Sequence, residues 1–301
     1  MLAQDSGLSP GTDVRAIAPD TAIGKVRLTV SDVERSGDFY EHALGLRATQ
    51  RDNSTFVLGV PDGPPLVELH EDPGARPLNR RATGLFHMAI LVPSRQELAR
   101  SLWRLAQHRW PLDGASDHLV SEALYLSDPD GNGIEIYRDR PRAEWPRSNG
   151  QLRMATLPLD LDGLVSELKS DSTGSAATDP VATCTRMGHV HLQVSDLGEA
   201  ERFYAGALGF EVTVRGYPGA LFVSAGGYHH HIGLNTWNSA GAGPPPPGSI
   251  GLRDFEVVLP DEHALGAVLA RATATGIEPD TSGDSALVRD PSGNTVALRS
   301  R

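Results

Sequence analysis

Histidine and glutamate residues at corresponding points of a repeated sequence are the residues of this chain best suited to do chemistry. The chain has 11 histidines, of which His87 lies in the apolar segment GLFHMAIL, and Glu135 lies in the similar segment GIEIY. Strand alternation places Glu135 on the face opposite its two isoleucine neighbours. His189 and His191 are two residues apart and share one strand face, so either could be a ligand. Two imidazoles and one carboxylate with open positions are typical of non-haem Fe(II) sites.

A run of three histidines, His229-His230-His231, is the second unusual feature. Three consecutive histidines in an acidic chain are not expected to serve packing alone. Four further histidines lie in segments expected to be helix or turn surfaces, where solvated side chains are the rule; they are His42, His70, His108 and His263.

These residues belong to an internal repeat, which indicates how the chain is organised. The segment KVRLTVSDVERSGDFYEHALGL from Lys25 matches HVHLQVSDLGEAERFYAGALGF from His189 at an offset of 164 residues. The segment that starts at Gly84 matches the one that starts at Gly251 at an offset of 167 residues. The sequence therefore predicts four modules, numbered first to fourth in chain order and alternating between two types.

Each module has the same predicted order of strand, helix and three strands. An alternating strand such as residues 26–30 opens the module. Asp32 is the predicted N-cap of a helix that ends near Leu44, and Gly45 or its counterpart Gly209 terminates the helix. A unit of about 50 residues with one apolar sheet face cannot bury that face alone. Two modules must pack together, and the cleft between them is the natural ligand site.

Composition excludes several classes of protein. The 301 residues include 27 Lys and Arg against 38 Asp and Glu, a net charge of −11, which argues against nucleic-acid binding. Cys184 is the single cysteine, so an internal disulfide or a cysteine-rich zinc site is impossible. No apolar run approaches the roughly 20 residues of a membrane helix, and the first 20 residues lack a signal-peptide pattern. A cytoplasmic protein, possibly a homodimer, is expected.

The predicted organisation has two halves. We expect a disordered tail over residues 1–21, one domain of two modules over 22–140, a linker with a short helix around Leu159–Leu168 over 141–186, and a second domain of two modules over 187–301. The segment DPDGNG from Asp128 imitates the start of a calcium loop, but its twelfth position is Asp139 rather than glutamate. A turn between two strands is the preferred interpretation.

From about residue 22 the chain resembles the vicinal oxygen chelate superfamily, which is built from paired βαβββ modules. The segments GHVHLQVSDLGEAERFYAGALGF, SEALYLSDPDGNGIEIY and GGYHHHIGLNTW resemble most closely the type I extradiol dioxygenases of the catechol 2,3-dioxygenase kind. The resemblance implies an α+β fold in which four modules pair into two open-barrel domains.

The resemblance also implies the ligands of a metal ion. In such enzymes one histidine comes from the first strand of one module, and a histidine and a glutamate come from the first and last strands of its partner. The ligand histidine lies seven residues before the aspartate that opens the helix, which selects His189, before Asp196, over His191. The spacing of 48 residues from His87 to Glu135 also fits, so His87, Glu135 and His189 are the implied ligands of Fe(II), or alternatively Mn(II).

Pairing of the second module with the third completes this ligand set. Pairing the first with the second would put Lys25 at the first ligand position, and pairing the third with the fourth would put Asp254 and Ala297 in the partner module. The first and fourth modules are therefore expected to form a degenerate site without metal.

Further roles follow from the resemblance. A tyrosine ten residues before the ligand glutamate lies near the substrate, and Tyr125 occupies that position. His118 is the nearest match to a histidine that contacts substrate or oxygen. The acid-base histidine matches His230, with His231 as the substitute one residue away. His191 and His231 are expected to contact the substrate, and Trp237, Trp145 and Phe222 are candidate walls for its ring.

The sequence thus predicts an extradiol ring-cleaving dioxygenase that acts on a small aromatic diol with O₂. Two alternatives remain open. One is a glyoxalase-like metal-dependent isomerase or lyase that does not use O₂. The other is a non-catalytic protein that binds a small antibiotic-like molecule between its modules.

Overall fold

The computed structural model describes residues 16–148, 150–168 and 180–301. Residues 1–15 of the expected tail, and residues 149 and 169–179 of the expected linker, lie outside the described part. Ile17, within the expected tail, is buried, and its N–H donates to the carbonyl of Gly209 at 2.7 Å. In the described ranges, no helix has the length and apolar character needed to cross a membrane.

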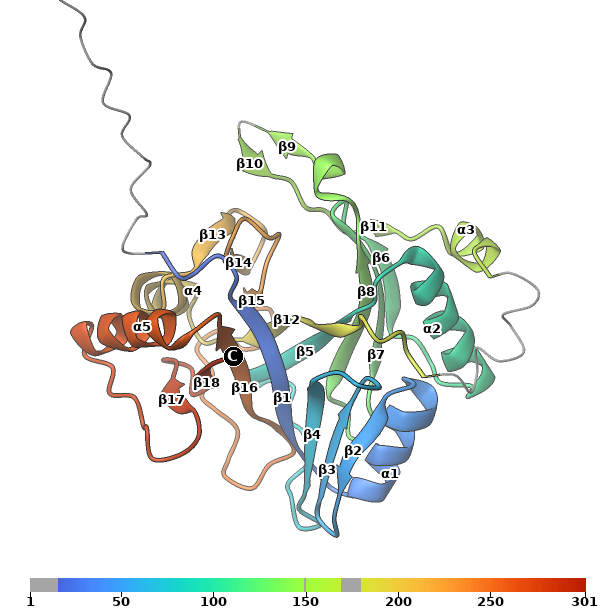
Figure 1. Ribbon diagram of the computed structural model, residues 1–301, viewed down its shortest axis with the longest axis horizontal. Helices are drawn as coiled ribbons and strands as arrows, with labels where there is room; N and C mark the ends of the chain where they lie inside the picture. Colours follow the sequence, from blue (N-terminus) through green and yellow to red (C-terminus); the bar gives the residue numbers. More distant parts are fainter. Residues whose placement is uncertain (1–15, 149, 169–179) are drawn as a thin grey trace, which may run out of the picture.

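The larger of two curved sheets has nine strands in the order β11-β6-β7-β8-β5-β12-β15-β14-β13 (Figure 1). Its strands are β5 (Gly84–Leu91), β6 (Gly114–Asp117), β7 (Ser121–Ser127), β8 (Gly133–Asp139), β11 (Leu157–Pro158), β12 (Arg186–Gln193), β13 (Glu211–Val214), β14 (Ala220–Ser224) and β15 (Ile232–Asn235). At its centre β5 of the second module pairs antiparallel with β12 of the third. The predicted pairing of these two modules is confirmed.

The smaller sheet joins the first module to the fourth. Its order is β17-β18-β16-β1-β4-β3-β2, with β1 antiparallel to β16 at the centre. The strands are β1 (Ala22–Val30), β2 (Arg47–Arg51), β3 (Thr55–Gly59), β4 (Pro65–Glu71), β16 (Gly251–Leu259), β17 (Ala286–Arg289) and β18 (Thr295–Ser300). In the fourth module an isolated bridge from Asp280 to Leu287 stands where the other modules have a further strand. Each sheet thus takes one module from each half of the chain, and the division into domains at 22–140 and 187–301 stays a prediction.

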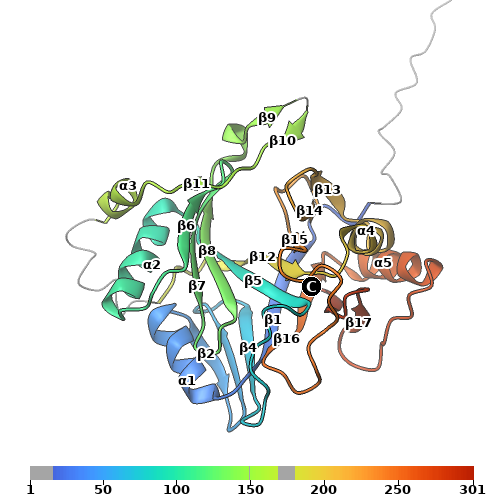
Figure 2. The ribbon, with the colours of Figure 1, turned by 180° about the vertical axis from the view of Figure 1, so that it is seen from behind.

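Helices cover the two flanks of the molecule (Figures 1 and 2). On one flank lie α1 (Val33–Asp38), its π-helical continuation η1 (Phe39–Ala43) and α2 (Arg95–Gln107); on the other lie α4 (Leu197–Glu201), its continuation η3 (Arg202–Ala207) and α5 (Glu262–Ala274). The side chain of Asp32 accepts from the N–H of Arg35 at 2.9 Å, as expected of an N-cap. Gly45 and Gly209 follow the helices with φ of +79° and +87°, a conformation that favours glycine.

The turn at Asp128 ties two modules together. Its carboxylate accepts the backbone N–H groups of Asp130 and Asn132 at 2.9 and 2.8 Å, and the hydroxyl of Tyr40 in the first module at 3.1 Å. Tyr204 donates to Asp290 at 3.0 Å in the same way in the other half of the chain. The carboxylate oxygens are occupied by these hydrogen bonds, which supports a turn rather than a calcium loop.

Residues 141–148 and 150–168 of the expected linker form regular elements beside the nine-stranded sheet. They form η2 (Arg142–Glu144), a hairpin of β9 (Arg147–Ser148) and β10 (Gln151–Leu152) that projects from the molecule, and α3 (Leu161–Ser166) (Figure 2). The predicted short helix is present as α3. The strand β11 pairs with β6, so this segment extends the sheet.

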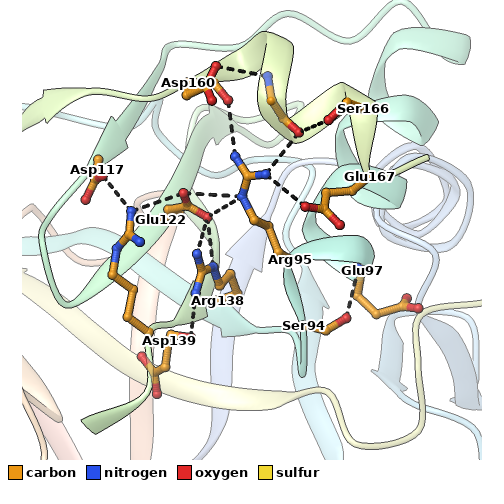
Figure 3. Close-up of polar contacts among 12 residues, drawn as sticks. Ser94, Arg95, Glu97, Asp117, Glu122, Arg138, Asp139, Asp160, Ser166 and Glu167 are labelled. Atoms are coloured by element: carbon orange, nitrogen blue, oxygen red, sulfur yellow. Dashed lines mark hydrogen bonds and ion pairs between the residues drawn. The ribbon is translucent and has the colours of Figure 1, made fainter. Parts of the chain in front are cut away.

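A buried carboxylate holds this region together (Figure 3). Glu122 on β7 is 3% exposed and accepts from Arg95 Nε at 3.0 Å, Arg138 Nε at 2.8 Å and an amino group of Arg140 at 3.2 Å. Arg95, the first residue of α2, also donates to the carbonyl of Gly163 in α3 at 2.9 Å. Helices α2 and α3 are therefore fixed to strands β7 and β8.

Candidate metal centre

Three side chains from the three central strands of the nine-stranded sheet meet at one point. They are His87 on β5, Glu135 on β8 and His189 on β12, with exposed fractions of 6%, 3% and 1%. The Nε2 atoms of His87 and His189 lie 3.0 and 3.2 Å from Oε2 of Glu135. Within the described residues, this is the one group of three or more His, Cys, Asp or Glu whose ligand atoms all lie within 4.8 Å of one another.

The register of the strands explains why these residues converge. Ala89 pairs with Glu135 on one side and with His189 on the other, so all three side chains share a face with His87 two residues earlier. Because alanine carries a single methyl group, the space above Ala89 stays free for the ligand atoms. A larger side chain at this position would occupy it.

Two β-bulges adjust the direction of the ligands. The β5–β12 register shifts between Met187 and His189, which makes Gly188 an extra residue, and shifts again opposite Phe86. A Cβ atom on Gly188 would lie 1.9 Å from the hydroxyl oxygen of Tyr137, so glycine is required there. The second bulge allows both Phe86 and His87 to face the same cavity.

The donor set suits a divalent metal ion. Burial raises the pKa of Glu135, but the neighbouring His189 and His87 outweigh burial and hold this pKa well below its ordinary value. Burial lowers the pKa of His189 to about 4. At neutral pH the site therefore offers one carboxylate and a neutral imidazole, which are the ligating forms. Nε2 of His87 is buried, and its 3.0 Å contact with Oε2 of Glu135 lacks the geometry of a hydrogen bond. A buried polar atom without a hydrogen bond costs roughly 1–3 kcal/mol. A bound cation would supply the partner.

A cavity of about 250 Å³ opens beside His87 and Glu135. This volume is slightly below the roughly 300–1,000 Å³ of pockets for drug-sized ligands and suits a molecule with a single ring. Most of its walls are aromatic and imidazole rings. The cavity is lined by Phe86, His87, Ser116, His118, Ser121, Tyr125, Glu135, Met154, Ala155, Thr156, His191, Tyr217, Phe222, His230 and Trp237.

His118 and Tyr125 form a coupled pair at one side of the cavity. Nδ1 of His118 lies 2.7 Å from the carbonyl oxygen of Ala155, which can only accept, so Nδ1 carries the proton. Nε2 of His118 then accepts a hydrogen bond from the hydroxyl of Tyr125, at a distance of 2.6 Å. Burial and the charge of Glu135 hold the pKa of Tyr125 well above its usual value, which keeps the hydroxyl protonated. Its oxygen can still accept a hydrogen bond from a ligand.

His191 lies in the cavity wall rather than in the three-residue cluster. Its ring contacts the rings of Phe86 and Trp237 at centroid distances of 5.2 and 5.4 Å. Burial, followed by the nearby His87 and His189, lowers its pKa well below the usual value. Its Nε2 is buried without a hydrogen-bond partner. His191 is thus a neutral polar group available to a ligand.

The three consecutive histidines point in different directions because they precede β15 and do not follow strand alternation. His230 lines the cavity, and its ring centroid is 4.1 Å from that of His189. Burial lowers the pKa of His230 well below its usual value. His231 is not part of the cavity wall, since its Nδ1 accepts the N–H of Ala225 at 3.1 Å. His229 is fully buried behind His230.

Several wall residues are not predicted by the sequence. Phe222 and Trp237 line the cavity as expected, whereas Trp145 packs against His229 instead. Strand alternation does not predict that the ring of Phe86 faces the cavity, because the direction of this side chain depends on the bulge. Met154, Ala155 and Thr156 come from the segment interpreted as a linker, where no apolar periodicity indicated a role.

The smaller sheet carries an ion-pair network at the corresponding place. Arg27, the counterpart of His191, contacts Asp254 and Glu256 at 2.5 and 2.9 Å. Glu256 stands where the larger sheet has Ala89, so the central space is filled by side chains. Arg299 also pairs with Glu256, at 2.9 Å. The expectation that this site binds no metal stays a prediction.

A larger cavity of about 460 Å³ lies between the two sheets and shares Phe86 with the first cavity. Its lining contains none of the predicted site residues. The smaller cavity is therefore the candidate site, because it adjoins the ligand cluster.

Comparison with protein families and known proteins agrees with this geometry. The model of the Glyoxalase/Bleomycin resistance protein/Dioxygenase superfamily matches residues 22–136 and 186–298. The chain is 44% identical to a protein named catechol-2,3-dioxygenase from Bacillus subtilis (strain 168), over 92% of this chain and 96% of that protein.

Solved structures show the same fold at low sequence identity. A candidate dioxygenase from Bacillus subtilis subsp. subtilis str. 168 aligns with a TM-score of 0.63 and 14% identity, over 95% of this chain and 86% of its own. Glyoxalase I from Zea mays aligns with a TM-score of 0.56 and 17% identity, over 93% and 92% of the two chains.

Proposed function

Because the chain belongs to the Glyoxalase/Bleomycin resistance protein/Dioxygenase superfamily, we propose that it is a cytoplasmic extradiol dioxygenase that cleaves a catechol-like diol with O₂, using Fe(II) or alternatively Mn(II). The observation that carries the proposal is the buried cluster of His87, Glu135 and His189 beside a small aromatic cavity. The 44% identity to a catechol-2,3-dioxygenase along nearly the whole chain supports the same reaction class.

His87, His189 and Glu135 would hold the ion, and the aromatic walls would receive the ring of the diol. Fe(II) bound there would place the diol beside O₂ and provide the path for electrons between them. The rings of Phe222 and Trp237 give flat apolar surfaces on which the ring of the diol would pack.

The polar wall residues would orient the substrate and handle its protons. His230, neutral and beside His189, would accept a hydroxyl proton and later return one. Tyr125, held by His118, would accept a hydrogen bond from the second hydroxyl. In the balanced reaction the ring carbon–carbon bond next to the diol breaks, both atoms of O₂ enter the product, and a yellow ring-opened semialdehyde forms.

The experiment is an O₂-uptake and absorbance assay on protein loaded anaerobically with Fe(II), with a panel of catechols. We expect consumption of O₂ and a yellow product in equal amounts for at least one catechol. His189→Ala should abolish both signals, while His108→Ala, a change at an exposed histidine, should leave them intact. Lack of uptake by metal-loaded wild-type protein with every catechol contradicts the proposal.

Metal analysis of the protein as purified distinguishes the two alternative functions. Zinc or nickel, with turnover of an oxygenated substrate and no O₂ uptake, would indicate a glyoxalase-like isomerase. Absence of metal from folded protein, with tight binding of a small aromatic molecule, would indicate a binding protein.

A further inference from the structure

A chain of hydrogen bonds runs from the cavity into the protein behind His230. Nδ1 of His230 lies 2.8 Å from Nδ1 of His229, and Nε2 of His229 lies 2.9 Å from Oδ1 of Asp139. Asp139 is the last residue of β8, the strand that also carries Glu135, and lies at the edge of the polar network of Figure 3. These hydrogen bonds therefore connect His230, which lines the cavity, to the partly exposed carboxylate of Asp139.

The hydrogen-bonding capacities of these groups determine where the protons lie. An ionised carboxylate only accepts, so Nε2 of His229 must donate to Asp139. In its neutral form, with the proton on Nε2, His229 has a lone pair on Nδ1 and accepts there. The proton between the two rings consequently belongs to Nδ1 of His230. This leaves Nε2 of His230 unprotonated, with no hydrogen bond to any described residue, in a side chain that lines the cavity.

The remaining contacts of Asp139 agree with this assignment. The hydroxyl of Tyr228 lies 3.1 and 2.9 Å from the two oxygens of Asp139 and must donate to them. The hydroxyl of Tyr137, 2.8 Å from that of Tyr228, then donates to Tyr228. Each hydrogen bond in this series thus has one defined donor and one defined acceptor.

Packing holds the middle ring in place. His229 is fully buried between the rings of Tyr228 and Trp145, whose centroids lie 4.0 and 5.4 Å away. The ring cannot turn without breaking the hydrogen bonds at both of its nitrogens. Because Nε2 of His229 donates to Asp139, Nδ1 of His229 is held in place as the acceptor for His230.

We propose that Asp139 and His229 are positioning residues that hold His230 in the tautomer with a free lone pair on Nε2, directed at a hydroxyl of the substrate. The inference rests on the proposed function for the identity of the substrate, but the tautomer itself follows from the hydrogen bonds of a neutral His229. It assigns the site a preference for ligands that donate a hydrogen bond at this point, such as a diol with a free hydroxyl, over ethers of the same shape.

The direct test is ¹H–¹⁵N NMR of the imidazole nitrogens in the full-length protein, both metal-free and loaded with Zn(II). We expect His230 to be protonated on Nδ1 and His229 on Nε2. Because this measurement uses the wild-type protein, it does not depend on the folding of any variant. A proton on Nε2 of His230 at neutral pH would overturn the proposal.

Variants of the two positioning residues extend the test. In Asp139→Asn the amide can donate to Nε2 of His229, which should move the proton of His230 to Nε2. The Fe(II) enzyme should then lose about 10²-fold or more in kcat, with a much smaller change in KM. His229→Gln keeps a donor toward Asp139 and an acceptor toward His230, so it should retain the wild-type tautomer, whereas His229→Leu should not. Asp130→Asn, in a distant turn, is the matched control.

The outcomes separate this proposal from the proposed function. The expected tautomers without turnover of any catechol would support the positioning chain and contradict the dioxygenase. Full catechol turnover by Asp139→Asn and His229→Leu, with unchanged KM and unchanged His230 tautomer, would overturn the positioning role and leave the dioxygenase intact.

Discussion

Replacement of Glu122 by glutamine tests how the region behind the candidate site is held. In Figure 3 this carboxylate stands between Arg95 and Arg138, and it also accepts from Arg140 at 3.2 Å. Its side chain is 5% exposed, and those of the three arginines are 23%, 12% and 26% exposed. The change preserves the shape of the side chain, removes its charge and puts an NH₂ group where one acceptor oxygen stood.

The cost follows from the contacts that are lost. Hydrogen bonds to charged groups contribute about 1.5–3 kcal/mol, and removal of one partner of a fully buried ion pair costs about 3–5 kcal/mol. Because the arginines are partly exposed, water can solvate them when the carboxylate is gone. We therefore expect a loss of about 2–3 kcal/mol of unfolding free energy, below the value for a fully buried pair. For a chain of 301 residues, whose unfolding entropy is about 0.6 kcal/mol/K, that corresponds to a fall in Tm of about 3–5 °C.

Differential scanning calorimetry of the two proteins at pH 7 measures this loss. Glu199→Gln is the matched control, because Glu199 lies 3.9 Å from Arg202, both side chains are exposed, and such pairs contribute about 0.3–0.5 kcal/mol. We expect the control to shift Tm by less than about 1 °C. If Glu122→Gln also stays within that range, the reasoning that this buried carboxylate fixes α2 and α3 to the sheet is refuted.

Three further changes test the site and its surroundings. Ala89→Val should fill the space above the sheet and remove metal from the protein, as measured by plasma mass spectrometry; a full metal content would contradict the register argument. Gly188→Ala should cost about 1–3 kcal/mol in urea unfolding, because its new methyl group would overlap the hydroxyl of Tyr137, and wild-type stability would show that this hydroxyl moves freely. Burial lowers the pKa of His231 to about 3, below the value near 6.5 in the unfolded chain, so its contribution to stability is complete above pH 6.5 and is lost as pH falls toward 3. The unfolding free energy of wild-type protein should therefore fall more steeply between pH 7 and 4.5 than that of His231→Gln, by up to about 1.4 kcal/mol per pH unit, and equal slopes would contradict this.

The modular plan was accessible from the sequence because it rests on local signals and on repetition. Asp32 and Asp196 cap their helices as expected, since an N-cap depends on residues within one turn. The pairing of the second module with the third followed from asking which pair completes a ligand set, and the β5–β12 ladder agrees with it.

Other parts of the site depend on long-range geometry that a single sequence does not reveal. The bulge at Phe86 exists because two strands distant in sequence differ in register, so alternation alone could not place this ring in the cavity. The three histidines before β15 lie in a turn, where no period predicts their directions. The roles of His229 and Asp139 required knowledge of which atoms meet across the fold.

The nested pairing of the modules also has a consequence for synthesis. The second and third modules are contiguous in the chain, so β5 can meet β12 while the fourth module is still being made. The central strand β1 of the first module must wait for β16, which emerges after all the strands of the nine-stranded sheet. An N-terminal edge that is exposed during translation is a surface on which misfolding can begin. The nine-stranded sheet, which holds the histidine–glutamate cluster, can thus form first on the ribosome. The first and fourth modules can then pair with each other beside a sheet that is already folded.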